Sequence, residues 1–324
     1  MPSDRQTAQR GSDPLDAMAD AEASGAGFNT LAGSVMPGVC DMRRLVTLVL
    51  RSSEAGNRRR EPREPLSLRF TAAAGGFPAS GHTVDLSLHG ALLGVPGNAA
   101  MTGRSVPVEI ERVGPLTCHV RGVSHMGVHT EFTGMTAPQM ARVGEVIEAA
   151  REENTVFIAR CQETAAEVAG VFGRALAAGD IAEHQLFSLD YTGIQDTDPQ
   201  QYLSPSTVLC DRMLPPIIGR VKDADAHVVF CAAVDASGYL ATHNLEYSKP
   251  QRRFETVWNT ANSRNRRIYE DRAGAMAASN MLPYIVQTYP RDMGGGVVVM
   301  LKEFDAPITV RGRHWGGLRL AVKA

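Results

Sequence analysis

Hydrophobic and polar positions change their period along this chain of 324 residues. Leu66, Leu68 and Phe70 alternate with polar residues, and an alternation of period two is typical of a half-buried β-strand. Further short runs of this kind follow, separated by glycine and proline, and several short strands at such spacing predict a small sandwich or barrel. The predicted strands cover residues 66–70, 83–95, 105–112, 114–124 and 127–132.

From Ala137 the period becomes that of a helix, which we expect to continue to Ala178 and to end at Gly179. Steps of three and four alternate along it, a pattern that favours a coiled coil and a homodimer through this helix, with Asn154 fixing the register. The alternative is a single helix lying on one or both domains, with a weak point at residues 155–156. The seam consists of Met140, Val143, Ile147, Ala150, Asn154, Phe157, Cys161, Thr164, Val168, Val171 and Ala175.

A different region follows Asp180. A strand, turn, strand pattern runs from Val229 to Thr242, with Asp235 and Gly238 forming the turn of a hairpin. A middle helical part and closing strands at 297–302 and 308–322 then predict a PAS-like or Cache-like α/β sensor, a fold that encloses a small pocket. His243 and His314 are conceivable ligand contacts there, although structural histidines are commoner at strand ends. Trp315 is expected in the core.

These patterns predict the α+β class and divide the chain into four parts. The first, 1–56, is expected to be disordered because it is poor in large apolar residues, apart from a short helix at 42–50. The others are the barrel at 57–136, the connecting helix at 137–178 and the sensor module at 179–324.

Composition limits the classes of function that the chain can have. A formal net charge of −2 argues against a general nucleic-acid binder, which carries a basic excess. The sequence shows neither an apolar run long enough to span a membrane nor an export signal, so we expect a cytoplasmic protein without membrane insertion. The five cysteines are far apart and lack a C-x-x-C pair, which indicates reduced thiols and no zinc site.

Motifs for catalysis or metal binding do not occur in the sequence. It contains neither a P-loop nor a G-x-S-x-G, so we expect a protein that is not an enzyme and has no cofactor. His119, His125 and His129 lie close in sequence, but on an alternating strand they are expected to be surface or core histidines, not metal ligands.

The candidate ligand-binding residues form two short motifs. A cationic run, Arg58-Arg59-Arg60-Glu61-Pro62-Arg63, contains an R-x-x-x-R pair, and Asp85, Ser87 and Gly90 form a D-x-S-x-x-G. Arginine can fork onto phosphate oxygens or the guanine O6/N7 edge, and it can stack on a base. Asp85 can accept the guanine N1 and N2 hydrogens, Ser87 supplies a hydroxyl, and Gly90 allows a turn or a close approach.

Each motif also has a plain structural explanation. An arginine run is often a solvated linker or a nonspecific nucleic-acid patch. A D-x-S-x-x-G is often a turn whose aspartate bonds its own backbone.

Residues 57–150, which contain both motifs in order, resemble the PilZ domain, a small bacterial β-barrel that binds cyclic di-GMP. The resemblance implies a six-stranded barrel followed by a helix, with the arginine arm and the D-x-S-x-x-G strand facing each other across the ligand. It implies that cyclic di-GMP binds Arg58, Arg59, Arg60, Arg63, Asp85, Ser87 and Gly90.

From about Arg160 to the end, many separated segments resemble the cytoplasmic C-terminal module of some methyl-accepting chemotaxis proteins. Asn265-Arg266-Arg267-Ile268-Tyr269 and Arg313-His314-Trp315-Gly316-Gly317 are two of them. Together the two resemblances imply a cyclic di-GMP receptor that passes nucleotide binding to a sensor module and regulates motility or chemotaxis. The alternative is a nucleotide-independent scaffold or docking protein for chemotaxis or flagellar components.

Overall fold

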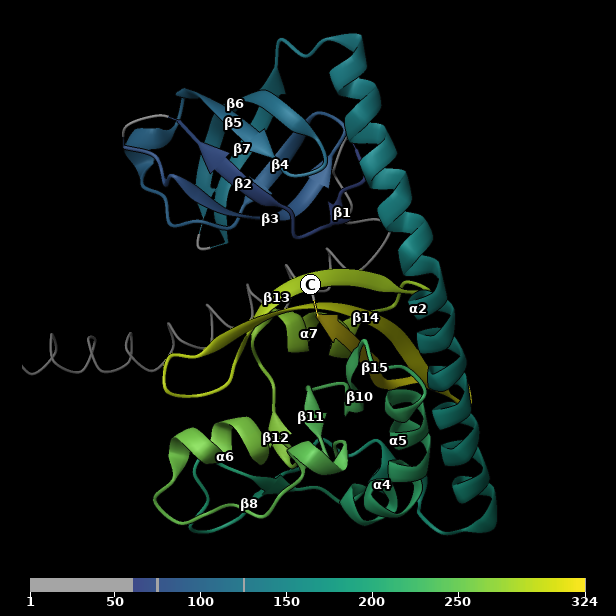
Figure 1. Ribbon diagram of the computed structural model, residues 1–324. Helices are drawn as coiled ribbons and strands as arrows, with labels where there is room; N and C mark the ends of the chain where they lie inside the picture. The colour runs from purple at the N-terminus through teal and green to yellow at the C-terminus, as the bar shows by residue number, and fades with distance from the viewer. Residues whose placement is uncertain (1–60, 74–75, 125, 324) are drawn as a thin grey trace, which may run out of the picture. The chain divides into compact units, whose positions relative to one another are not determined.

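The computed structural model describes residues 61–73, 76–124 and 126–323 (Figure 1). The predicted disordered segment 1–56 with its short helix lies outside these residues, as do Arg58, Arg59 and Arg60. The described chain begins with a β-barrel, continues through one long helix and ends in a second region of strands and helices.

The six-stranded antiparallel barrel predicted from the sequence is confirmed. Its strands follow one another in the order β3-β2-β5-β6-β7-β4, and the pairing of β4 with β3 closes the ring. A short additional strand, β1, pairs with the end of β3 that β2 leaves free. The strands are β1 (Glu64–Pro65), β2 (Arg69–Ala72), β3 (Ser80–Ser87), β4 (Gly90–Leu93), β5 (Ser105–Ile110), β6 (Gly114–Ser124) and β7 (Gly127–Thr133).

Alternation along the strands fills the interior of the barrel. In β5, for example, the buried Val106, Val108 and Ile110 alternate with exposed residues, because successive side chains of a strand point to opposite faces. One predicted strand was too long: residues 83–95 form the later part of β3 and then β4, joined by a tight turn at Leu88 and His89.

The long helix, α2, spans Ala137–Ala178, the bounds that the sequence pattern predicts. It begins with a capping box, in which the Thr136 side chain accepts from the Gln139 backbone N–H and the Gln139 side chain accepts from Thr136. It ends at Gly179, whose φ of 75° is a left-handed conformation that glycine adopts at little cost. The helix is continuous through Thr155 and Val156, where the sequence indicated a weak point.

Two hydrophobic cores share α2. Its first half contributes Val143, Val146, Ile147 and Ala150 to the interior of the barrel. Its second half belongs to the core of the C-terminal region, through Cys161, Ala165, Val168, Phe172 and Ala175.

The coiled coil predicted through the heptad seam is therefore wrong, because the chain's own cores occupy that seam. Of the seam residues, only Met140 is exposed, while Val143, Cys161 and Val168 are completely buried within the chain. Asn154 is buried too, but its amide donates to Glu64 Oε1 of β1 at 2.6 Å and not to a second helix. The homodimer predicted through this helix therefore has no free seam on which to form.

An antiparallel sheet in the order β10-β15-β14-β13 organises the C-terminal region. Its strands are β10 (Val228–Asp235), β13 (Ile285–Asp292), β14 (Val298–Val310) and β15 (Arg313–Lys323). Around them lie α3 (Glu183–Leu186), β8 (Thr192–Gly193), β9 (Tyr202–Leu203), α4 (Thr207–Met213), α5 (Pro215–Asp223), β11 (Tyr239–Leu240), α6 (Thr256–Asn262), β12 (Arg267–Ile268) and α7 (Arg272–Ser279).

The two faces of this sheet bury different side chains. One face packs on α2 and α5 and includes Phe304, Ile308 and Leu320. The other carries a smaller apolar cluster, to which Phe230 and Leu301 belong, and buries the charged residues Glu303, Arg291 and Arg319. Trp315 lies in the larger core as predicted, tilted against Phe172 with ring centroids 4.8 Å apart.

The predicted turn after β10 is present, but the hairpin is not. Gly238 N–H donates to Asp235 O at 2.9 Å, and the Asp235 carboxylate accepts from the backbone of Ser237 and Tyr239. The next strand, β11, pairs with β12 and not with β10, whose neighbour is β15. The turn therefore leads the chain out of the main sheet.

Two further expectations concern the thiols and the membrane. Cys118, Cys161, Cys210 and Cys231 are buried free thiols, as predicted, while Cys40 lies outside the described residues. None of the helices among the described residues is long and apolar enough to cross a membrane.

Replacing Asn154 with alanine should destabilise the chain by about 2 kcal/mol, because the buried Glu64 carboxylate loses a hydrogen-bond donor. Urea denaturation followed by circular dichroism measures this loss. Glu152→Ala, at an exposed position on the same helix, is the matched control and should change the free energy of unfolding by less than about 0.5 kcal/mol.

Equal losses in the two variants would contradict a role for the Asn154–Glu64 contact. An unfolding midpoint that rises with protein concentration would instead show that the chain self-associates.

Candidate functional site

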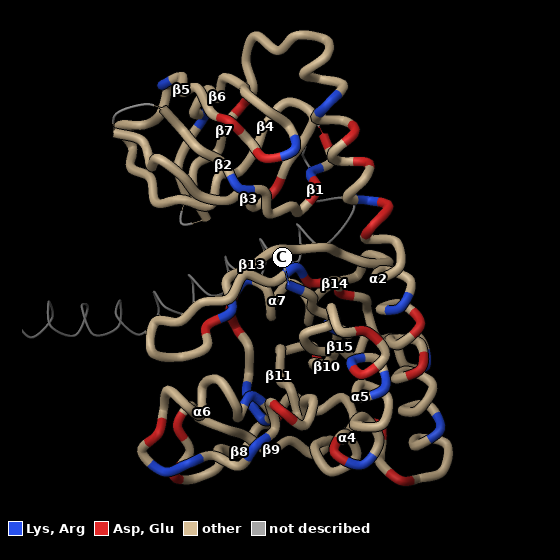
Figure 2. Tube along the Cα trace, viewed as in Figure 1, with Lys and Arg blue, Asp and Glu red and all other residues tan. Residues whose placement is uncertain are grey.

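The two halves of the motif meet where β1 pairs with β3. Pro65 of β1 lies opposite Asp85 of β3, so Arg63, which directly precedes β1, reaches the same place. Its Nη1 donates to Asp85 Oδ1 at 3.1 Å, and both side chains are largely shielded from solvent, with exposed fractions of 27% and 14%. The structure thus joins residues 22 positions apart in sequence. Figure 2 shows residues of both signs side by side around β1.

The rest of D-x-S-x-x-G forms the turn from β3 to β4. Ser87 and Gly90 are the last cross-strand pair before the turn, and Ser87 Oγ donates to Gly90 O at 3.2 Å. The serine side chain is therefore occupied in closing the turn. This geometry agrees with the explanation of D-x-S-x-x-G as a structural turn. The contact of Arg63 with Asp85 is additional, because the turn does not require it.

Gly90 is required by the close approach of β7. A Cβ atom built at this position would lie 2.4 Å from Thr130 O, a backbone atom that cannot move aside without disturbing the β4–β7 pairing. The glycine of the motif therefore has a packing role in the barrel, independent of any ligand.

A second contact ties the incoming chain to the turn, and the sequence reasoning did not single it out. Glu61 Oε1 lies 2.6 Å from His89 Nδ1, and both side chains are more than a third exposed. Both residues stand between motif positions, Glu61 in the arginine run and His89 before Gly90. Their positions within the two motifs could have drawn attention to Glu61 and His89, but nothing in the sequence shows that the two side chains are in contact.

Of the predicted ligand-binding residues, Arg63, Asp85, Ser87 and Gly90 lie together. Arg58, Arg59 and Arg60 lie outside the described residues. The described chain begins at Glu61, and the contact of Glu61 with His89 places this residue beside the turn.

The residue after Arg63 connects this site to the long helix. Glu64 is buried, accepts from Asn154 Nδ2 at 2.6 Å and lies 3.5 Å from Arg151 Nε on α2. Burial raises the pKa of the Glu64 carboxyl above its ordinary value, while Arg151 and Asn154 act in the opposite direction. Adjacent residues therefore contact Asp85 on one side and α2 on the other.

The histidines that were considered as metal ligands have other partners. His119 Nδ1 is 3.2 Å from Ser105 Oγ, and His129 Nε2 is 2.8 Å from Ser124 Oγ, while His125 lies outside the described residues. Across the part of the chain that the structure describes, no group of three His, Cys, Asp or Glu side chains is placed to hold a metal ion.

His243 and His314, the histidines considered as ligand contacts in the C-terminal region, both make backbone contacts. His243 is buried, and its Nδ1 accepts from the backbone N–H of Asn244 at 2.7 Å. His314 Nε2 lies 2.7 Å from Ala278 O. These contacts fit structural histidines, and His243 also borders a cavity.

Comparison with known proteins identifies the barrel. Residues 57–149 match the family model of the PilZ domain. No curated protein matches this chain. The family match ends within α2, so the likeness of residues 160–324 to the C-terminal modules of chemotaxis proteins rests on the sequence pattern alone, and the same holds for a PAS-like or Cache-like fold.

Two solved structures are similar to the same part of the chain. One is the PilZ domain of CeSA from a cellulose-synthesizing bacterium, with 18% identity, covering 28% of this chain and 98% of the other. The second is the PilZ domain of YcgR from Escherichia coli with c-di-GMP, with 20% identity, covering 30% of this chain and 94% of the other. Both have a TM-score of 0.24, a value that carries no argument about function.

Replacing Gly90 with alanine should lower the free energy of unfolding by at least about 2 kcal/mol, because the new methyl group collides with the backbone of β7. Thermal and urea unfolding measure the loss. Gly122→Ala is the matched control in a neighbouring strand, since a Cβ there meets nothing within 4 Å. An equal effect of both substitutions would show that the close approach at Gly90 does not determine its identity.

Proposed function

We propose that the barrel is a non-enzymatic receptor for cyclic di-GMP and that α2 transmits binding to the C-terminal region. The observation that carries the proposal is the 3.1 Å contact between Arg63 and Asp85, which assembles the two halves of the motif at one point of the barrel surface. The match of residues 57–149 to the PilZ domain supports the same ligand.

The assembled side chains suit the two chemical parts of a cyclic dinucleotide. The Arg63 guanidinium can fork onto a phosphate or onto the O6/N7 edge of guanine. Asp85 can accept the N1 and N2 hydrogens of a guanine, and Ser87 can offer its hydroxyl. Arg58, Arg59 and Arg60 precede this point in the chain and would supply further cations for the second phosphate and for base stacking.

In the structure, Arg63 and Asp85 neutralise one another. Binding would exchange this ion pair for contacts of Arg63 with the nucleotide and of Asp85 with a guanine edge. The exchange costs little, because a partly exposed ion pair contributes only about 0–1 kcal/mol to stability. The pair would thus keep both side chains close to their working positions without holding them there strongly.

Glu64 gives the route by which binding would reach α2. Ordering of the arginine arm on the nucleotide moves or fixes Arg63, and the next residue, Glu64, is hydrogen-bonded to Asn154 on the helix. Since α2 contributes to both cores, a change in its position at the barrel biases the packing of the C-terminal region. We infer that this output regulates motility or chemotaxis, following the likeness of residues 160–324 to chemoreceptor modules.

Cyclic di-GMP should bind the purified full-length chain in isothermal titration calorimetry, and Arg63→Ala should weaken binding at least about tenfold, because charge-assisted hydrogen bonds are lost. Arg142→Ala is the matched control: this exposed arginine of α2 bonds Arg112 O and Glu145, away from the motif. Absence of heat at tens of micromolar nucleotide, together with an unchanged melting temperature, would favour the nucleotide-independent scaffold.

The second prediction separates binding from transmission. In hydrogen-exchange mass spectrometry, cyclic di-GMP should slow amide exchange in α2 around residues 151–157 of the wild type. Asn154→Ala should retain nucleotide affinity within about threefold, since Asn154 does not border the motif, but should lose most of this protection. Unchanged protection in the variant would exclude the Glu64–Asn154 contact as the route.

A further inference from the structure

A cavity lies on the face of the C-terminal sheet that is turned away from α2. Three arginines line it: Arg264, Arg291 of β13 and Arg319 of β15. Aromatic side chains and His243 complete the lining, together with Asp271 at the start of α7. This cavity belongs to neither the barrel nor the nucleotide motif.

Arg291 is the unusual member of the lining. Its side chain is buried, with only 2% of the residue exposed, yet neither Nε nor Nη2 has a hydrogen-bond partner among the described residues. Its neighbours are ring faces: its Cζ lies 4.3 Å from the ring centroid of Tyr247 and 5.0 Å from that of Phe230. Buried charges are normally paired and hydrogen-bonded, so an unpaired guanidinium edge calls for a partner.

The other two arginines are already engaged. Arg319 forks onto Glu303 through Nε and Nη2, each at 3.0 Å. Arg264 Nη1 donates to the backbone carbonyls of Thr260 and Asp292 at 2.8 and 2.9 Å. Arg291 is therefore the residue of this group that can receive an anion without breaking an existing contact.

The charges facing the cavity do not balance. Three guanidinium groups, those of Arg264, Arg291 and Arg319, line the cavity with the Asp271 carboxylate, and Glu303 and Asp305 lie buried next to Arg319. Burial and the neighbouring Glu303 raise the pKa of the Asp305 carboxyl well above its ordinary value, which favours its neutral form. His243 adds no negative charge and stays neutral, because burial lowers its pKa well below the usual value and the three arginines lower it further. With Asp305 in its neutral form, one positive charge is left over, which a single negative charge on a ligand would neutralise.

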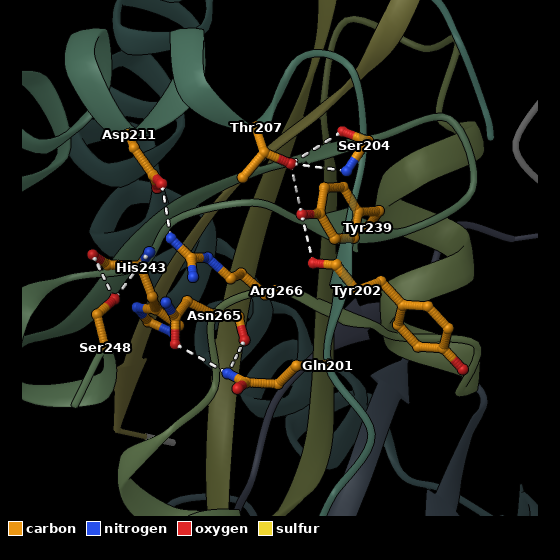
Figure 3. Close-up of polar contacts among 10 residues, drawn as sticks. All are labelled: Gln201, Tyr202, Ser204, Thr207, Asp211, Tyr239, His243, Ser248, Asn265 and Arg266. Carbon is orange, nitrogen blue, oxygen red and sulfur yellow. Dashed lines mark hydrogen bonds and ion pairs between the residues drawn. The ribbon is translucent and has the colours of Figure 1, made fainter. Parts of the chain in front are cut away.

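Surrounding contacts fix the shape of the cavity wall. Figure 3 shows His243 beside Ser248, whose Oγ donates to His243 O at 3.0 Å and accepts from His243 N–H at 3.1 Å. In the same view Arg266 donates to Asp211 at 3.0 Å. The wall that carries His243 is therefore held by hydrogen bonds before any ligand arrives, which lowers the entropy that binding must overcome.

We propose that this cavity binds a small monocarboxylate on the Nε–Nη2 edge of Arg291. Two adjacent N–H groups of a guanidinium match the two oxygens of a carboxylate. The rings of Phe230 and Tyr247 flank the guanidinium and would enclose the short apolar part of the ligand.

Charge favours a monocarboxylate over phosphate. A carboxylate carries one negative charge, which equals the unbalanced positive charge, whereas phosphate carries more near neutral pH. The free space amounts to about 20 Å³, which is room for about one water molecule, so a small ligand would enter with a modest outward movement of the lining side chains.

The test uses the full-length chain without cyclic di-GMP, so its outcome is independent of the proposed nucleotide site. Sodium formate and sodium acetate are titrated into the wild type at constant ionic strength, with chloride as the reference anion, and the melting temperature is recorded. We expect it to rise with the logarithm of formate or acetate concentration once the site is half filled. Isothermal titration calorimetry with acetate should give a saturable isotherm.

Arg291→Met should abolish this rise or weaken apparent affinity about 10- to 100-fold, because the charged hydrogen bonds are lost. The unliganded variant should melt no lower than the wild type, since methionine removes an unpaired buried charge. Arg291→Lys, which keeps the charge but lacks the fork, should also lose affinity at least about tenfold. Arg313→Met is the matched control, an exposed arginine that also lies over an aromatic ring, and it should retain the full effect.

Three results would overturn the proposal. The first is no saturable effect of formate or acetate on the wild type, by melting temperature or by calorimetry. The second is an effect that survives in Arg291→Met. The third is stabilisation by phosphate and not by either carboxylate, which would show that the cavity selects a different anion.

Discussion

The antiparallel pairing of β1 with β3 is the constraint on which the functional part of the barrel depends. Two residues of β1 are enough to place Arg63 beside Asp85 and to direct Glu64 toward Asn154 of α2. One side of this short strand thus faces the D-x-S-x-x-G motif and the other faces the helix. A slip of one residue in the pairing would exchange the two roles, because successive side chains of a strand point to opposite faces.

The helix α2 likewise serves two parts of the chain. A single apolar stripe packs first in the barrel and then against the C-terminal sheet, so one element contributes to both cores. The barrel and the C-terminal region consequently share buried surface through α2.

Much of the barrel and its motif could be predicted from the sequence. Alternation of period two located the strands, and D-x-S-x-x-G with the arginine run marked Arg63, Asp85, Ser87 and Gly90. The partner of the α2 seam could not be predicted, because an apolar stripe shows that a helix face is buried but not what buries it. Asn154 illustrates this: a polar residue on such a stripe can bond a second helix or, as here, a carboxylate 90 positions earlier.

The C-terminal region departed further from the sequence expectation. The turn at Asp235 and Gly238 was recognisable, but the strand after it joins another sheet, a choice made by contacts distant in sequence. The role of Arg291 could not be predicted either. It depends on burial and on the lack of hydrogen-bond partners for Nε and Nη2 among the described residues, and the local sequence pattern indicates neither.

The uninterrupted course of α2 has a mechanical consequence. With 42 residues the helix is about 63 Å long, at about 1.5 Å of rise per residue. Bending such a rod would strain its ladder of backbone hydrogen bonds, so under the proposed route a tilt imposed at Asn154 would be carried to the last turns by the helix itself. A stiff helix of that length needs no chain of side-chain contacts to connect its two ends. A single proline in the middle of α2 would kink or break the helix and so disconnect them.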